Sequence, residues 1–283
     1  MGNGLHEWPL ILFTVLGQSI AGGVIVTGLA WLSTDDKPQK QRIVNAMFAL
    51  WVLMGLGFLA SMMHMGSPMR AFNSMNRVFA SSLSNEVLFG SIFFALGGLW
   101  WLLSAMKKMP TGLDKVWLII TMLMGLLFVW AMTRVYMIST VPTWNTPHTT
   151  IGFFMTLFVV GPILGTLLLR VAKFPFNSGK LAAISIVAYI VTIASVLLQS
   201  GEIALIATSV QKAVDLVPDF GVLQVIRLVV TSFGLLLWIL PVVRQNQPSV
   251  LSLLLGTVLV LIGEFIGRGL FYGLHMTVGM AVA

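Results

Sequence analysis

Two stretches of the sequence place titratable side chains beside long apolar runs. The first covers residues 64–86, with the sequence HMGSPMRAFNSMNRVFASSLSNE, and contains His64, Arg70, Arg77 and Glu86. Ionisable groups at the edge of hydrocarbon are costly to keep there, so they are more often functional than accidental. We therefore expect the chemistry of this protein in this stretch.

The residue types of this stretch match the needs of a site for a quinol head group. Oxidation of a quinol releases electrons and protons, so the site needs a base and donors that hold the ring oxygens. His64 titrates near neutral pH, and a carboxyl group that is removed from water, such as that of Glu86, can share this role. Phe72 and Phe79 offer apolar faces to a ring and its tail.

Each of these residues also has an ordinary structural interpretation. Glu86 in the first turn of a helix interacts favourably with the helix dipole, and Ser84 or Asn85 can serve as the N-cap. His64 can be an interfacial side chain at a helix end, and the two arginines can bind lipid phosphate. The residues alone leave both interpretations open.

The second stretch lies near the C-terminus and reads GEFIGRGLFYGLHMTVGM. Glu264 and Arg268 are four residues apart, so they share a helix face and can form an ion pair. A structural pair is the interpretation that we favour. The functional alternative is a proton path beside the first stretch, with His275 nearby.

Metal and haem sites are not indicated within this protein. It has no cysteine, which excludes disulfides, thiolate metal sites and iron–sulfur ligation by its own residues. A membrane haem needs histidines on facing helices, whereas all four histidines fall near predicted helix ends at one membrane face: His6, His64, His148 and His275.

The elements that position these residues are predicted to be membrane helices. The sequence is 58% hydrophobic and only 9% charged, and its apolar runs are long enough to cross a bilayer. The runs lack the alternation of barrel strands, so we expect an all-α, polytopic bundle that fills residues 1–283 as a single membrane domain. The eight predicted spans are approximately 9–32, 43–65, 86–106, 115–138, 149–172, 181–200, 222–243 and 249–271.

The distribution of charge predicts the orientation of this bundle. The connections after the odd-numbered spans carry ten basic and three acidic residues, whereas the remaining residues include six of each. Because basic loops stay in the cytoplasm, we expect both termini on the periplasmic side. The same rule explains the net charge of +7 without a nucleic-acid partner, for which no basic stripe with interleaved aromatics is present.

Several long strings resemble a known family from end to end. They are HEWPLILFTVLGQ, LWVLMGLGFLASMMHMGSPMRAFNSMNRV, LSNEVLFGSIFFALGG, VPTW, LVPDFG and GEFIGRGLFYGLHMTVGM. These strings are similar to the membrane-anchor subunit of dimethyl sulfoxide reductase and its close paralogues in bacterial molybdoenzyme complexes.

The resemblance implies an eight-helix anchor in the bacterial inner membrane. Such a subunit oxidises menaquinol in anaerobic respiration and passes the electrons to an iron–sulfur subunit, which serves a molybdopterin catalytic subunit. It has no haem, metal or cluster of its own, and it is not the catalytic subunit of the reductase. The implied quinol-binding residues are His64, Gly66, Arg70, Phe72, Ser74 and Glu86, with Arg77, Glu264 and Arg268 as secondary candidates.

Two other functions remain open. A proton-coupled transporter would line a path with Glu86, Glu264 and Arg268, but it predicts polar residues at both membrane faces and helices broken near the midplane. A passive anchor would have no quinol site, and only the clustering of polar residues at one face argues against it.

Overall fold

The structure is a computed structural model that describes residues 2–64, 76–207 and 211–277. Within these residues, eight helices are long and apolar enough to cross a membrane, so the all-α prediction is confirmed. Two short 3-10 segments, η1 (Gly2–Glu7) and η3 (Ala213–Leu216), lie outside them. The helices are α1 (Trp8–Leu32), α2 (Lys37–His64), α3 (Ser82–Ala105), α4 (Leu113–Tyr136), α5 (Pro147–Val171), α6 (Ser178–Ile203), α7 (Phe220–Val243) and α8 (Val250–Gly273).

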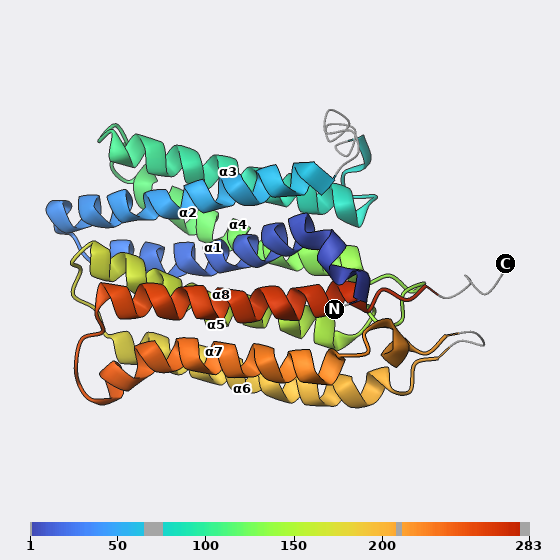
Figure 1. The fold of residues 1–283 in the computed structure, drawn as a ribbon. Coiled ribbons are helices and arrows are strands. Elements are labelled where there is room, and N and C mark those ends of the chain that lie inside the picture. The colour runs from blue at the N-terminus through green and yellow to red at the C-terminus, as the bar shows by residue number, and fades with distance from the viewer. Residues whose placement is uncertain (1, 65–75, 208–210, 278–283) are drawn as a thin grey trace.

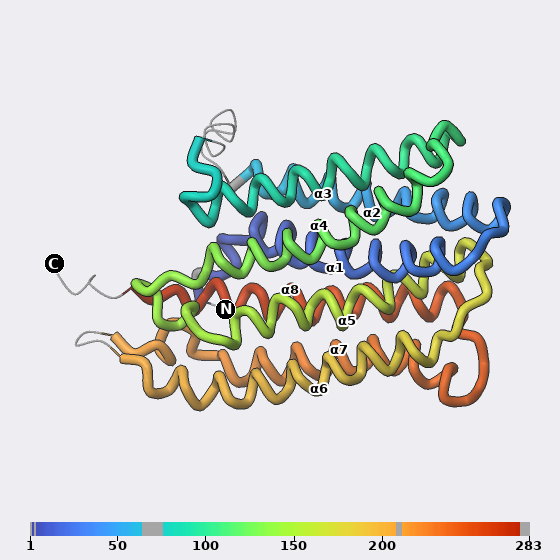
Figure 2. The backbone as a smooth tube through the Cα atoms, turned by 180° about the vertical axis from the view of Figure 1, so that it is seen from behind, coloured from blue at the N-terminus to red at the C-terminus, as the bar shows by residue number. Residues whose placement is uncertain are grey.

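The eight helices form two four-helix halves that lie side by side (Figure 1). The N-terminal half contains α1–α4 and the C-terminal half contains α5–α8. Helix α1 is the most extensively buried, because it packs against α2 and α4 of its own half and against α5 and α8 of the other. The view from behind shows α4 and α5 meeting on the opposite face of the same junction (Figure 2).

Small residues permit the closest helix crossings. Gly22 of α1 faces Gly161 of α5, and a Cβ atom on either would collide with the backbone of the other helix. Gly234 and Gly256 join α7 to α8 in the same way. In hydrocarbon, such close backbone approach supplies packing contacts that apolar side chains facing lipid do not.

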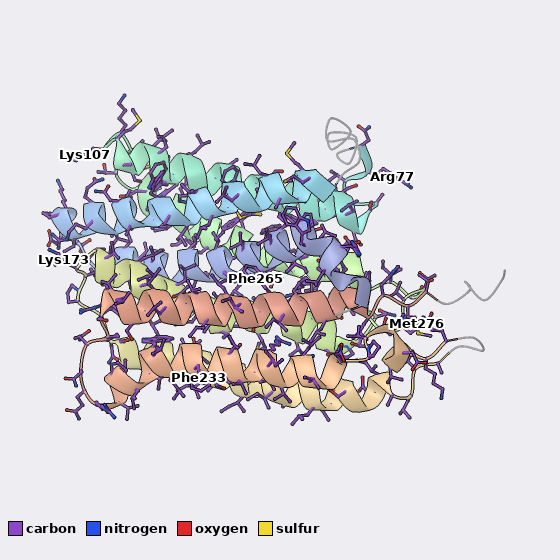
Figure 3. All side chains as sticks on the ribbon, viewed as in Figure 1. Arg77, Lys107, Lys173, Phe233, Phe265 and Met276 are labelled. Atoms are coloured by element: carbon purple, nitrogen blue, oxygen red, sulfur yellow. The ribbon has the colours of Figure 1, made fainter. Side chains whose placement is uncertain are left out.

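The two ends of the bundle differ in what they carry. The N-terminus, Arg77 and Met276 lie at one end, which we call the termini end, whereas Lys107 and Lys173 lie at the other (Figure 3). The connections predicted to be basic are therefore together at the end opposite the termini. Every candidate residue that the structure describes lies nearer the termini end.

Helix α3 begins earlier than the sequence indicated. It starts at Ser82 with Ser81 as N-cap, so Glu86 is its fifth residue, in the second turn. The expectation that Glu86 opens the helix, with Ser84 or Asn85 as cap, was wrong. The cause is local, because the Asn85 side chain accepts a hydrogen bond from the Phe79 amide at 2.6 Å and leaves the residues between free to be helical. Helix α2 likewise begins at Lys37 rather than at residue 43.

Candidate functional site

The first predicted site lies at the termini end of the N-terminal half, between α2 and α3. His64 is the last residue of α2, and Glu86 belongs to α3. The side chain of His64 lies outside the described part of the structure, as do the other four expected quinol-binding residues: Gly66, Arg70, Phe72 and Ser74. Glu86 and the secondary candidate Arg77 are therefore the residues of this stretch whose side chains can be placed.

A turn leads into α3. The carbonyl oxygen of Arg77 accepts hydrogen bonds from the amides of Ala80 and Ser81, at 3.0 and 2.9 Å. Phe79, inside this turn, has a φ of 65°, a left-handed conformation that is uncommon for a bulky residue. Arg77 and Phe79 are exposed, so the turn presents a cation and an aromatic ring just outside the helix that carries Glu86.

Glu86 points into the bundle rather than towards its surroundings. It belongs to the buried face of α3, which continues through Gly90, Phe93, Gly97 and Trp100 at alternating spacings of four and three residues. The residue is 5% exposed. One carboxylate oxygen, Oε1, has no hydrogen-bond partner among the described residues. A buried carboxylate oxygen without a partner is costly, and such costs are typical of functional sites.

Aromatic side chains form the apolar interior of the same half. The ring of Phe13 lies 5.4 Å from that of Phe58 and 5.9 Å from that of Phe128, and Phe93 lies 6.0 Å from Phe128, centroid to centroid. Phe128 also packs against Gly90, one turn after Glu86. The carboxyl group thus lies next to an aromatic cluster, which suits a ligand that combines a polar ring edge with an apolar body.

The second predicted site is a buried polar cluster in the C-terminal half. Glu264 accepts a hydrogen bond from the hydroxyl of Thr156 at 2.7 Å and forms an ion pair with Arg227 of α7 at 3.3 Å. The expected pairing of Glu264 with Arg268 along α8 was therefore wrong. Helix α7 packs closely against α8 and carries Arg227 to the carboxylate, so a contact between helices replaces the one within the helix.

Arg268 has different partners. Its Nη2 donates to the side-chain oxygen of Gln18 at 2.9 Å, and its guanidinium carbon lies 3.5 Å from the ring centroid of Phe153. Its Nε has no hydrogen-bond partner among the described residues, although the side chain is buried. Arg268 therefore links α8 to α1 and α5, and so joins the two halves of the bundle.

A small cavity of about 50 Å³ lies within the C-terminal half, with polar groups on its wall. Helices α5–α8 all contribute to it, and its lining includes His148, Gln224, Arg227, Glu264 and Arg268. Beyond the cavity, the His148 ring shares a hydrogen bond with Ser195 Oγ at 2.8 Å and lies 3.3 Å from the carboxylate of Glu202.

Sequence reasoning missed three members of this cluster. Gln18 and Arg227 interrupt otherwise apolar runs, and that interruption was the signal that could have found them, because polar residues inside membrane helices usually face a partner. His148 was counted only as a possible haem ligand. Its partner Glu202 was assigned to a loop, but α6 continues to Ile203 and includes it.

The described histidine side chains do not gather into a ligand set. His275 stacks on Trp144 with centroids 4.6 Å apart, whereas His148 lies with Ser195 and Glu202. Across residues 2–64, 76–207 and 211–277, no three His, Asp or Glu side chains converge as a metal site requires.

Comparison with known proteins identifies the family. The family model for the DMSO reductase anchor subunit (DmsC) matches residues 1–274. The chain belongs to the DMSO reductase anchor subunit family. It is 54% identical to two anaerobic dimethyl sulfoxide reductase chains of Escherichia coli strain K12, YnfH over 283 residues and a second one over 286 residues, with both members of each pair covered in full. It is 38% identical to an anaerobic dimethyl sulfoxide reductase chain of Haemophilus influenzae, over 283 residues that cover 100% of this sequence and 99% of the relative.

Membership of the DMSO reductase anchor subunit family confirms the resemblance inferred from the sequence strings. Together with the eight apolar helices, it makes this protein a multi-pass membrane protein and the anchor component of a reductase of this type. The match covers both halves of the bundle, so the cluster at Glu264 lies inside the family domain as Glu86 does.

Proposed function

We propose that this anchor subunit binds menaquinol at the termini end of its N-terminal half and oxidises it. The electrons pass to an iron–sulfur subunit and from there to a molybdopterin catalytic subunit. The relatives at 54% identity are named as chains of anaerobic dimethyl sulfoxide reductase, which supports such a complex in the bacterial inner membrane. The charge of the loops supports a periplasmic position for the termini end.

The observation that carries this proposal is the environment of Glu86. Its carboxyl group is buried, one of its oxygens lacks a partner among the described residues, and aromatic rings line the interior beside it. A quinol offers what this environment lacks, namely a hydroxyl donor attached to a flat apolar ring. Glu86 is therefore suited to accept a hydrogen bond from the quinol and then its proton.

The other expected residues complete the reaction in this proposal. Arg70 and Ser74 hold the ring oxygens, and His64 shares proton acceptance with Glu86. Two electrons leave for the iron–sulfur cluster of the partner subunit, and two protons leave for water at the termini end. Because protons are released on the side where the quinol is oxidised, the step moves no net charge across the membrane.

The test is binding of a fluorescent quinol-analogue inhibitor to the complete complex, together with the rate of menaquinol oxidation. Glu86→Gln keeps the size of the side chain but removes its charge and its ability to act as a base. We expect assembled complex with at least a hundredfold slower oxidation, in the range of about 10²–10⁴ for loss of a general base. His64→Ala should weaken inhibitor binding as well.

The matched control is Asp219→Asn, which neutralises an exposed carboxylate at the same end. It should leave binding and oxidation at wild-type levels. Wild-type oxidation and binding in Glu86→Gln would move the quinol site elsewhere. Failure of the wild-type complex to bind the inhibitor would instead favour a passive anchor.

A further inference from the structure

The polar cluster around Glu264 is too extensive to be explained by one ion pair. It contains three charged residues on two helices, Arg227, Glu264 and Arg268, all buried. A single structural pair requires only two charges, and burial of additional ones is costly unless they act. The cluster lies in the C-terminal half, whereas Glu86 lies in the N-terminal half, so the quinol site as proposed does not include it.

The cluster is connected to the surface by a short series of polar groups. The Glu202 side chain is 54% exposed, and its carboxylate lies 3.3 Å from the ring of His148, which is 8% exposed. His148 lines the cavity, and Glu264, 4% exposed, lines it as well. Exposure therefore falls from Glu202 through His148 to Glu264 along one route.

The cavity has the properties of a hydrated one. Its volume of about 50 Å³ exceeds the roughly 10–15 Å³ that one water requires, and its wall offers several donors and acceptors. It is too small for a quinol ring with its tail. Glu264 lies nine residues before the end of α8 at Gly273, or about 14 Å along the helix axis, so water in the cavity would reach a carboxylate deep in the bundle.

Buried hydroxyl groups extend the series towards Glu86. The hydroxyls of Tyr136 on α4 and Tyr272 on α8 lie 2.6 Å apart at the junction of the two halves. Glu86 is within electrostatic range of both tyrosines, and Arg268 is likewise within range of them. The Tyr136 ring also contacts that of Phe153, over which Arg268 lies.

We propose that the cavity in the C-terminal half is a water-filled proton-release path, which carries quinol protons past the Tyr136–Tyr272 pair and through Glu264 and His148 to Glu202 at the termini end. This inference rests on the proposed quinol oxidation at Glu86. For each quinol oxidised, the iron–sulfur partner takes two electrons and the path delivers protons to water, so no covalent bond to the protein forms. Glu264 and His148 are proton carriers here and do not touch the quinol.

The competing explanation is that Arg227 and Glu264 only stabilise the fold. Glu264→Gln alone does not separate the two, because it leaves Arg227 buried without its carboxylate partner. The double variant R227Q/E264Q removes both charges together and keeps two hydrogen-bonding side chains of similar length. His148→Leu interrupts the route closer to the surface and leaves the ion pair intact.

The experiment uses the complete complex reconstituted in lipid vesicles with a pH-sensitive dye at the termini end. Menaquinol oxidation, proton release and inhibitor binding are measured in parallel. In assembled R227Q/E264Q and His148→Leu we expect oxidation and proton release to slow at least tenfold, the low end for loss of proton transfer, with inhibitor binding within about twofold of wild type. Asp215→Asn, an exposed carboxylate of η3 at the same end, is the control and should change neither.

Wild-type oxidation and proton release in both assembled variants would overturn the path and leave the ion pair a purely structural role. If the double variant does not assemble, His148→Leu decides between the two explanations by the same measurements. Slowing in Glu86→Gln together with wild-type rates in His148→Leu would reject the path while quinol oxidation at Glu86 still stands.

Discussion

At the scale of single residues, the two buried carboxylates of this protein differ in how they are satisfied. Glu264 has Arg227 and Thr156 as partners, whereas Glu86 has one oxygen without a partner among the described residues. The first arrangement compensates for burial within the protein. The second leaves capacity for a hydrogen bond from outside the protein, which is why Glu86 is the stronger candidate for direct contact with a ligand.

We predict that Arg227→Met lowers the stability of the protein because it leaves Glu264 buried without a cation. Removal of one partner of a buried pair costs about 3–5 kcal/mol, so the thermal transition of the purified subunit or complex should fall by several degrees. Arg134→Met is the control, because Arg134 is exposed and its guanidinium donates to the Met137 sulfur. Equal transitions in the two variants would show that the Arg227 pair does not stabilise the fold.

At the scale of helices, close crossings decide which polar residues meet. The contact between Gly22 and Gly161 draws α1 against α5, and the same two helices carry Gln18 and Phe153 to opposite sides of Arg268. A wider crossing would separate those groups. Small residues in α1 and α5 therefore help to position the buried charge as well as to pack the bundle.

We predict that Gly161→Ala disturbs this crossing. The added Cβ would collide with the backbone of Gly22, and a backbone, unlike a flexible side chain, cannot rotate away. We expect less assembled protein in the membrane and a lower thermal transition, measured by size-exclusion chromatography after heating.

Gly98→Ala on α3 is the matched control for this prediction. It adds the same methyl group where nothing lies within 4 Å, so it should leave both quantities unchanged or slightly higher. A Gly161→Ala protein that behaves like the Gly98→Ala protein would mean that the α1–α5 crossing tolerates a wider separation.

At the scale of the whole molecule, the bundle is polarised from end to end. The basic connections gather at the end opposite the termini, and the buried charges lie in the half of the membrane nearer the termini. A transporter would need a polar route between both faces, whereas the described helices run unbroken and bury their charges towards one end. This asymmetry fits chemistry that uses one face of the membrane.

We predict the orientation of the bundle from the same asymmetry. The sequence has no cysteine, so single cysteines can be introduced and labelled in intact cells with a reagent that does not cross the inner membrane. Arg77→Cys and Asp219→Cys should react, because both positions are exposed at the termini end, expected to be periplasmic. Lys107→Cys and Lys173→Cys should react only after the membrane is opened, and the reverse pattern would invert the proposed orientation.

The sequence by itself determined the class of the molecule, its family and the residues at its first site. Long apolar runs, the bias of basic residues and the polar stretch at 64–86 are properties of local composition, which do not depend on how helices rotate against one another. The same reasoning placed Glu86 among the candidates before its burial was known.

Only the tertiary structure decided which buried groups meet. It paired Glu264 with Arg227 instead of Arg268, placed Gln18 against Arg268, and brought His148 to Glu202. These contacts depend on the rotation and depth of helices that are far apart in the sequence, and sequence spacing carries no information on either. Spacing predicts neighbours along one helix, but in a bundle the partner of a buried charge is chosen by the helix that packs against it.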